Sequence, residues 1–191
     1  MFSKKPVYNS QSMADLLSFH AKICFTSVGF LIVDRQVLLV KHKKLGIWLA
    51  PGGHLEANEL PHQSAERECF EESGVAVKAI SAIPMLPGTA SQYVPQPFAM
   101  NLHWISEVNY KDRLDSVHPK KRHLTAVWPK GCEQHLVFCY LVVPTGDLKI
   151  TQNLAQTDAI GWFKESEVDS LETTPDIKSE IHLAFSLTTL S

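Results

Sequence analysis

The sequence of 191 residues has no large excess of charge, few cysteines and no long apolar run. Its 18 basic and 20 acidic side chains give a net charge of -2, which excludes a general electrostatic attraction to nucleic acid or anionic membranes. The longest apolar run, ICFTSVGFLIV, is too short to cross a bilayer. The first residues lack the apolar core and cleavage site of a signal peptide. We therefore expect a cytoplasmic protein.

The four cysteines form no CxxC pair, which disfavours a zinc site built on that motif. They are Cys24, Cys69, Cys132 and Cys139. Three of them lie in apolar or helical patterns. We expect all four to be reduced, buried thiols and not a disulfide framework.

Apolar patterning predicts a mixture of strands and helices along the chain. The expected strands are residues 24–34, 36–43, 46–56, 75–86, 98–108 and 135–144. The third of these segments is a short strand that runs into a Pro-Gly-Gly break. Helical patterns cover residues 12–22, 58–74 and 175–190, and residues 158–171 combine a strand with a short helix. Asp34 and Arg35 predict a tight hairpin between the first two strands. Asn58 is the expected N-cap of the second helix, which then carries Pro61 in its first turn and ends at Gly74.

This order favours an α/β layered fold with a mixed sheet. We expect a flexible N-terminus over residues 1–10 and a single domain over residues 11–191. Residues 109–133 carry prolines, histidines and lysines without a strong period, and they predict an insertion or a long loop. We see no internal repeat and no low-complexity segment.

Residues 51–75 concentrate acidic side chains, with six glutamates and Arg67 as the only base. On a helix, Glu68, Glu71 and Glu72 stand at positions i, i+3 and i+4, so they share one face. Three like charges on one face are unfavourable unless a cation neutralises them. Hard divalent cations take oxygen ligands, which predicts Mg²⁺, or Mn²⁺ in its place. The alternative is a surface helix whose carboxylates are only solvated.

The spacing within this stretch resembles the Nudix box, the signature of hydrolases that act on nucleoside diphosphates linked to another moiety. From Gly53, five residues lead to Glu59, and seven more lead to Arg67 and Glu68. The run then continues as CFEESGV to the end of the box. The one departure is Cys69, where the family usually has an aliphatic residue, and cysteine packs as a small hydrophobe.

The resemblance implies a Nudix-type α/β/α sandwich with a central mixed β-sheet. It also implies metal ligands, namely Glu68, Glu71 and Glu72, with the Gly53 carbonyl and Glu56 as further candidates. Arg67 and Glu59 would orient these carboxylates through an ion pair. Bound metals neutralise a pyrophosphate and lower the pKa of an attacking water, whose proton a base must accept. The candidate bases are Glu68, Glu72 and, from a later loop, Glu133.

Residues outside the box are expected to select the substrate. The candidates are Trp48, His54, Tyr93, Lys120, Lys121, Arg122 and His135. Aromatic rings could stack a nucleobase, and the basic run in the insertion could close over phosphates. In the alternative interpretation, the aromatic rings belong to the core, the histidines are hydrogen-bonded at the surface, and the basic loop residues are only solvated. The expected partner is a small-molecule nucleotide, with a homodimer left open.

Three function classes follow from the sequence. The first is a metal-dependent pyrophosphohydrolase that cleaves a nucleotide, a nucleotide sugar or a dinucleoside polyphosphate. The second is a nucleotide-binding or sensor module without turnover, which a lost Glu71 or Glu72 would favour. The third is an isopentenyl-diphosphate isomerase-like enzyme, which the intact box disfavours.

Overall fold

The computed structural model describes residues 22–105 and 132–188. Its contacts divide the chain into a smaller unit, residues 1–24 and 102–135, and a larger unit, residues 25–101 and 136–191. The expected N-terminal helix lies outside the described residues, as does nearly all of the predicted insertion. Within the described residues, no helix is long and apolar enough to cross a membrane.

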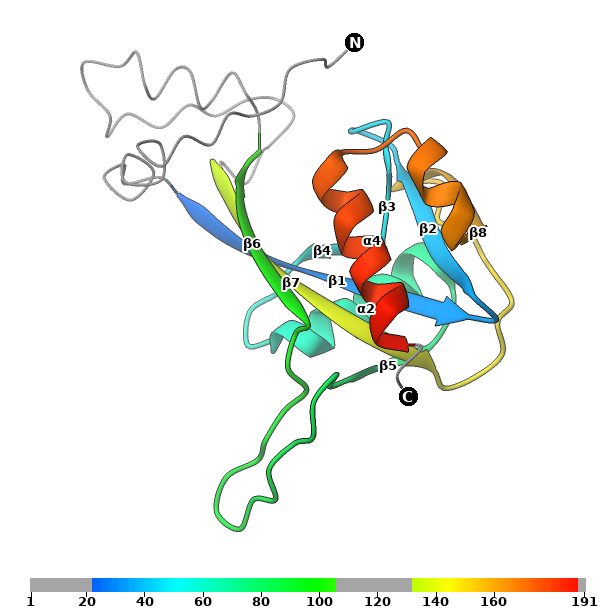
Figure 1. Cartoon of the computed structure of the whole chain (residues 1–191). Helices are drawn as coiled ribbons and strands as arrows, with labels where there is room; N and C mark the ends of the chain where they lie inside the picture. The colour runs from blue at the N-terminus through cyan, green and yellow to red at the C-terminus, as the bar shows by residue number, and fades with distance from the viewer. Residues whose placement is uncertain (1–21, 106–131, 189–191) are drawn as a thin grey trace, which may run out of the picture. The chain divides into compact units, whose positions relative to one another are not determined.

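The strands form one eight-stranded sheet in the order β3-β2-β1-β7-β5, with β4 paired to β1, β6 to β7 and β8 to β2 (Figure 1). The strands are β1 (Ile23–Val33), β2 (Gln36–His42), β3 (Trp48–Leu49), β4 (Gly52–His54), β5 (Val77–Ile80), β6 (Ala99–Trp104), β7 (Gln134–Pro144) and β8 (Thr157–Lys164). The helices are α2 (Pro61–Ser73), the 3₁₀ helix η1 (Glu165–Ser170) and α4 (Pro175–Thr188). The predicted α/β class with a central mixed sheet is confirmed.

Alternating side chains of the central strands build two cores, one on each face of the sheet. Phe30 packs into the core that includes Ile181, Ala184 and Phe185 of α4. The next residue, Leu31, packs into the core that includes Ala65 and Cys69 of α2. Because successive strand side chains point to opposite faces, one run of apolar residues holds a helix on each side. The box helix α2 is thereby anchored to the sheet.

The predicted hairpin between β1 and β2 is confirmed. Val33 pairs with Gln36, and the two loop residues between them, Asp34 and Arg35, have φ angles of 49° and 59°. Two-residue loops with positive φ at both positions match the twist of the flanking strands.

The predicted start of the box helix is wrong, whereas its predicted end is confirmed. Asn58 has a φ of 65° and lies in the preceding loop, and α2 begins at Pro61 with Leu60 as its N-cap residue. The side chain of Gln63 accepts the Leu60 N–H at 3.0 Å, which supplies the cap from inside the helix. Gly74 ends α2 in the left-handed conformation, with a φ of 75°.

Two of the predicted strands differ from those in the structure. The expected strand over residues 75–86 is reduced to β5, and the proline-rich residues that follow form a loop that extends away from the sheet (Figure 1). Proline has no N–H to donate to the hydrogen bonds between strands, which explains why the strand ends earlier than predicted. The third strand stops at the predicted Pro-Gly-Gly break as β3, which pairs with β2, but residues beyond the break form a separate strand, β4, which pairs with β1.

The expectation of four reduced cysteines is wrong for two of them. In the smaller unit, Cys24 and Cys132 form a disulfide across a sequence separation of 108 residues. A pair so far apart leaves no spacing signal in the sequence. Cys69 and Cys139 are free and buried, as expected, and burial raises the pKa of both thiols above its usual range.

Candidate active site

The box carboxylates occupy one side of α2 but differ in exposure. Ala65 and Cys69 fix the opposite side of the helix in the core. Glu68 and Glu72 are buried, with 7% and 3% of their surface exposed, whereas Glu71 is exposed. We call Glu68, Glu71 and Glu72 the carboxylate cluster. Two of its three members, Glu68 and Glu72, are thus buried, which the sequence pattern alone did not indicate.

The two glycines of strand β4 lie directly against Glu68 and Glu72 of the carboxylate cluster. β4 pairs with β1, with Gly52 opposite Val28 and Gly53 opposite Ser27. The Gly52 N–H donates to Glu72 Oε2 at 3.1 Å. A Cβ atom at Gly53 would overlap the Glu68 carboxylate, so the close approach requires glycine. The strand and the helix therefore build one compact acidic site within the larger unit.

Arg67 joins the acidic side chains into one network. Its Nε and Nη2 donate to the two carboxylate oxygens of Glu59 at 2.8 and 3.0 Å. Its Nη1 donates to Glu68 Oε1 at 2.8 Å and to Glu71 Oε2 at 3.2 Å. The expected ion pair is present, and its side-on geometry with Glu59 is the form that fixes a guanidinium most firmly.

Two further contacts of Arg67 were not foreseen from the sequence. Its Nη2 donates to the His54 carbonyl at 3.0 Å and lies 3.3 Å from Ser64 Oγ. The first contact ties the guanidinium to β4, and the second ties it to the first turns of α2. Neither has a sequence signal, because backbone carbonyls and serine hydroxyls are common acceptors at every position.

Burial and the Arg67 network displace the pKa values of these carboxyls in opposite directions. The hydrogen bond from Arg67 lowers the pKa of Glu59. Burial raises the pKa of Glu68 despite the adjacent Arg67, and burial raises the pKa of Glu72 to about 7. A cation needs deprotonated oxygens, so metal binding at this site should weaken as the pH falls.

The donor set of the site suits a hard divalent cation. The carboxylates of Glu68 and Glu72 lie against the β4 backbone, Glu71 stands on the same face of α2, and carboxylate oxygens are the ligands that Mg²⁺ and Mn²⁺ prefer. Free Cys69, on the same helix, belongs to the core and not to this set. The further candidate Glu56 is exposed on the loop before α2, where its N–H donates to Glu59 Oε2 at 2.9 Å.

A family model for the NUDIX domain matches residues 25–120, half of the chain. The chain belongs to the Nudix family. It is 32% identical over 102 residues to the NAD-capped RNA hydrolase NudC of Photobacterium profundum, which covers 51% of this chain and 38% of that protein. It is 40% identical over 53 residues to a putative 8-oxo-dGTP diphosphatase of Bacillus subtilis, which covers 26% of this chain and 36% of that protein.

Solved structures place this Nudix chain in the same fold. A NUDIX-family hydrolase from Clostridium perfringens superposes with a TM-score of 0.59 at 20% identity, covering 86% of this chain and 97% of that one. At this level of identity the likeness concerns the fold alone. The Nudix chain spans little more than a third of the length of the curated relatives named above.

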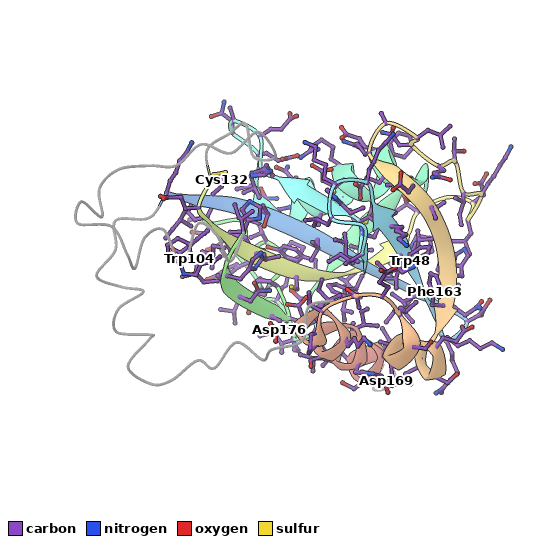
Figure 2. All side chains as sticks on the ribbon, turned by 90° about the horizontal axis from the view of Figure 1, so that it is seen from above. Trp48, Trp104, Cys132, Phe163, Asp169 and Asp176 are labelled. Carbon is purple, nitrogen blue, oxygen red and sulfur yellow. A yellow bond between two sulfur atoms is a disulfide. The ribbon has the colours of Figure 1, made fainter. Side chains whose placement is uncertain are left out.

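The predicted substrate residues of the larger unit do not form one group. Trp48 is half-buried, and its ring packs edge to face on Phe163 with centroids 4.7 Å apart (Figure 2). It packs against the α4-side core, which favours the core interpretation. His54 is half-buried on β4 beside the Nudix box, and Tyr93 lies half-exposed on the loop between β5 and β6. Their roles stay predictions.

The remaining predicted residues belong to the smaller unit. Glu133 is buried, and its carboxylate accepts the Lys22 N–H at 2.8 Å. The ring of His135 lies edge to face with His103, with centroids 5.7 Å apart. Lys120, Lys121 and Arg122 lie outside the described residues, so the proposed closure of the basic run is untested.

Proposed function

We propose that this chain is a metal-dependent pyrophosphohydrolase that cleaves the diphosphate link of a nucleoside diphosphate joined to another moiety. The observation that carries the proposal is the carboxylate cluster, organised by Arg67 beside Gly52 and Gly53 of β4. The relatives are named for the hydrolysis of an NAD cap and of 8-oxo-dGTP, and both substrates contain a phosphoanhydride next to a nucleoside. This shared chemistry supports the substrate class.

The proposed mechanism assigns each box residue a task. Mg²⁺ or Mn²⁺, held by Glu68, Glu71 and Glu72, would neutralise the phosphate oxygens and supply an activated water. Arg67 bridges the Glu68 and Glu71 carboxylates through Nη1, and its positive charge offsets part of their mutual repulsion. Glu59 holds the guanidinium from the other side. The proton acceptor is proposed to be Glu68 or Glu72, with Glu133 as the third candidate.

The test is a substrate panel assayed with Mg²⁺ or Mn²⁺ and with all products identified by chromatography. The panel contains NAD⁺, ADP-ribose, 8-oxo-dGTP, UDP-glucose, diadenosine tetraphosphate and isopentenyl diphosphate. We expect at least one nucleotide to be cleaved at its phosphoanhydride, yielding a nucleoside monophosphate. Glu72→Gln should abolish this cleavage. Glu172→Gln, whose carboxylate is exposed and pairs with Lys41, should not, and it serves as the matched control.

The outcomes of the panel separate the function classes. Tight nucleotide binding without products would support the binding or sensor module. Isomerised isopentenyl diphosphate would support the third class. Equal activity in Glu72→Gln and in the wild type would assign the turnover to a contaminant or to another site. The proposed partner remains a small-molecule nucleotide, and the homodimer stays a prediction.

We also keep the cytoplasm as the proposed location, although one feature opposes it. Disulfides are rare in cytosolic proteins, and Cys24 and Cys132 are bonded. The thiol state of these two cysteines can be read in intact cells by alkylation and mass spectrometry. Reduced thiols would agree with the cytoplasm, and a fully oxidised pair would contradict it.

A further inference from the structure

The C-terminal end of α2 is covered by a segment that lies far away in the sequence. A helix leaves its last four carbonyls without partners inside the helix. In α2 these carbonyls belong to residues 70–73, and two of these residues are Glu71 and Glu72. The covering residues, 151–157, connect β7 to β8 and belong to the same larger unit.

All four of these carbonyls accept a hydrogen bond. Gly74 donates its N–H to the Phe70 carbonyl at 2.8 Å, and Thr151 donates its N–H to the Ser73 carbonyl at 2.7 Å. The two carbonyls between them are served by one residue, Asn153. Its Nδ2 donates to the Glu71 carbonyl at 3.2 Å, and its backbone N–H donates to the Glu72 carbonyl at 3.3 Å.

The orientation of the Asn153 amide is fixed by its partners. Oδ1 accepts the Ala155 N–H at 3.0 Å, and Nδ2 also donates to Gln156 Oε1 at 3.0 Å. The amide oxygen must face the Ala155 N–H, which only donates, and the amide nitrogen must face the Glu71 carbonyl, which only accepts. An asparagine therefore satisfies both sides at once, which aspartate and serine cannot do.

The covering segment is itself tied to the sheet. Lys43 donates its N–H to the Gln156 carbonyl at 3.1 Å and its Nζ to the Leu154 carbonyl at 3.0 Å. Thr157 is the first residue of β8 and pairs with His42 of β2. Through these contacts, the position of the last turn of α2 is set by the strands.

Electrostatics explains why this end of the helix needs such support. The C-terminus of a helix carries a partial negative charge, and side-chain carboxylates there are unfavourable. The last turn of α2 contains Glu71 and Glu72 and no basic residue. The side-chain and backbone N–H groups of Asn153 therefore place partial positive charge at the negative end of α2, where the helix has no basic side chain.

We propose that Asn153 is a positioning residue for the carboxylate cluster. By holding the carbonyls of Glu71 and Glu72, it fixes the backbone that carries two of the three carboxylates that would hold a divalent cation. The inference rests on the proposed function, because it concerns the metal-binding step of that function. It assigns to a residue outside the Nudix box, 82 positions from Glu71, a part in metal binding.

The test is Mn²⁺ binding to metal-free protein, measured by titration calorimetry in the full chain. Asn153→Asp keeps the acceptor for Ala155 but places an oxygen against the Glu71 carbonyl. We expect it to weaken Mn²⁺ binding about 5- to 10-fold, because one hydrogen bond is lost and a carboxylate oxygen then faces the Glu71 carbonyl. Gln156→Glu makes the same charge change in the same segment while keeping its acceptor oxygen, and it should bind Mn²⁺ within about twofold of the wild type.

A kinetic split distinguishes positioning from general damage to the fold. In Asn153→Asp, excess Mn²⁺ should restore kcat, and the KM for the substrate at saturating Mn²⁺ should stay unchanged. A variant that is merely less folded would lose kcat at every Mn²⁺ concentration, and that result would overturn the assignment.

A second variant keeps the inference testable if Asn153→Asp does not fold. Asn153→Ser adds no charge, can still accept the Ala155 N–H, and is too short to reach Glu71. Weakened Mn²⁺ binding in folded Asn153→Ser supports the inference, and unchanged binding in the variants that fold overturns it. If neither variant folds, Asn153 is a folding residue and the inference is wrong. A wild-type protein that binds no Mn²⁺ would overturn the proposed function itself, which separates the two failures.

Discussion

Gly53 has no side chain because the Glu68 carboxylate occupies the space where one would begin. Glu68 is buried against strand β4, in which Gly53 pairs with Ser27 of β1. A larger residue would have to displace either the carboxylate or the strand. The glycine of the Nudix box is thus explained in this chain by the packing of one carboxylate against one backbone.

Gly53→Ala should therefore displace Glu68 and lower turnover about 10-fold or more, since a misplaced catalytic group costs about this much. The matched control is Gly146→Ala, where a Cβ would meet nothing within 4 Å. The control should keep full activity. Equal activity in the two variants would show that the position of Glu68 does not limit the reaction.

Glu71→Gln should abolish most activity while leaving the metal-free fold intact. Glu71 is exposed, and the substitution removes a charge that lies near Glu68 and Glu72 on the same helix face. The substitution also removes the exposed ion pair with Arg67 Nη1, although glutamine keeps an acceptor oxygen for it. Without metal, the relief of repulsion should offset this small loss, so that the melting temperature stays equal or rises slightly. Calorimetry on the metal-free protein measures this, and a clear fall in melting temperature would make Glu71 a structural residue.

Reduction of the Cys24–Cys132 disulfide should destabilise the protein. The bond closes a long segment, with a separation of 108 residues, and cross-links of this kind typically contribute about 2–4 kcal/mol. The free energy of unfolding in denaturant should fall by about this amount when dithiothreitol is present. A double Cys24→Ser, Cys132→Ser variant should show no response to the reductant. A wild-type protein that is equally indifferent would argue against the bond.

His62 should make the protein less stable in mild acid. It is buried in the first turn of α2, and burial lowers its pKa below 6.5. The unfolded chain therefore binds a proton more readily than the folded chain, so stability is lost as the pH falls through about 6.5. The raised pKa of Glu72 acts in the opposite direction, so His62 is isolated by the difference between two proteins: from about pH 7.5 to 5.5, the change in the free energy of unfolding should be more favourable in His62→Gln than in the wild type. Parallel curves for the two proteins would contradict this role of His62.

The sequence predicted the parts of the site that are encoded locally. The hairpin at Asp34–Arg35 and the end of α2 at Gly74 follow from residues that tolerate positive φ. The carboxylate cluster follows from the 3.6-residue period and from the spacing that ends in Glu72. In each case the decisive residues lie within a few positions of one another.

The structure departs from the sequence prediction where distant contacts override local preference. Asn58 is a favourable N-cap residue, yet it closes a loop in which the Glu59 N–H donates to the Glu56 carbonyl at 3.2 Å, and α2 starts three residues later. The Cys24–Cys132 bond and the contact of Asn153 with Glu71 join residues 108 and 82 positions apart. No single-sequence pattern encodes such pairs.

The most direct test of the account follows bound metal and turnover in the same sample. Protein stripped of metal by chelation is titrated with Mn²⁺, and both bound Mn²⁺ and the rate of cleavage of the best substrate in the panel are recorded. The account predicts no turnover without metal, and a rise in turnover that follows occupancy of the carboxylate cluster and is lost in Glu72→Gln. Turnover that survives exhaustive chelation would contradict it.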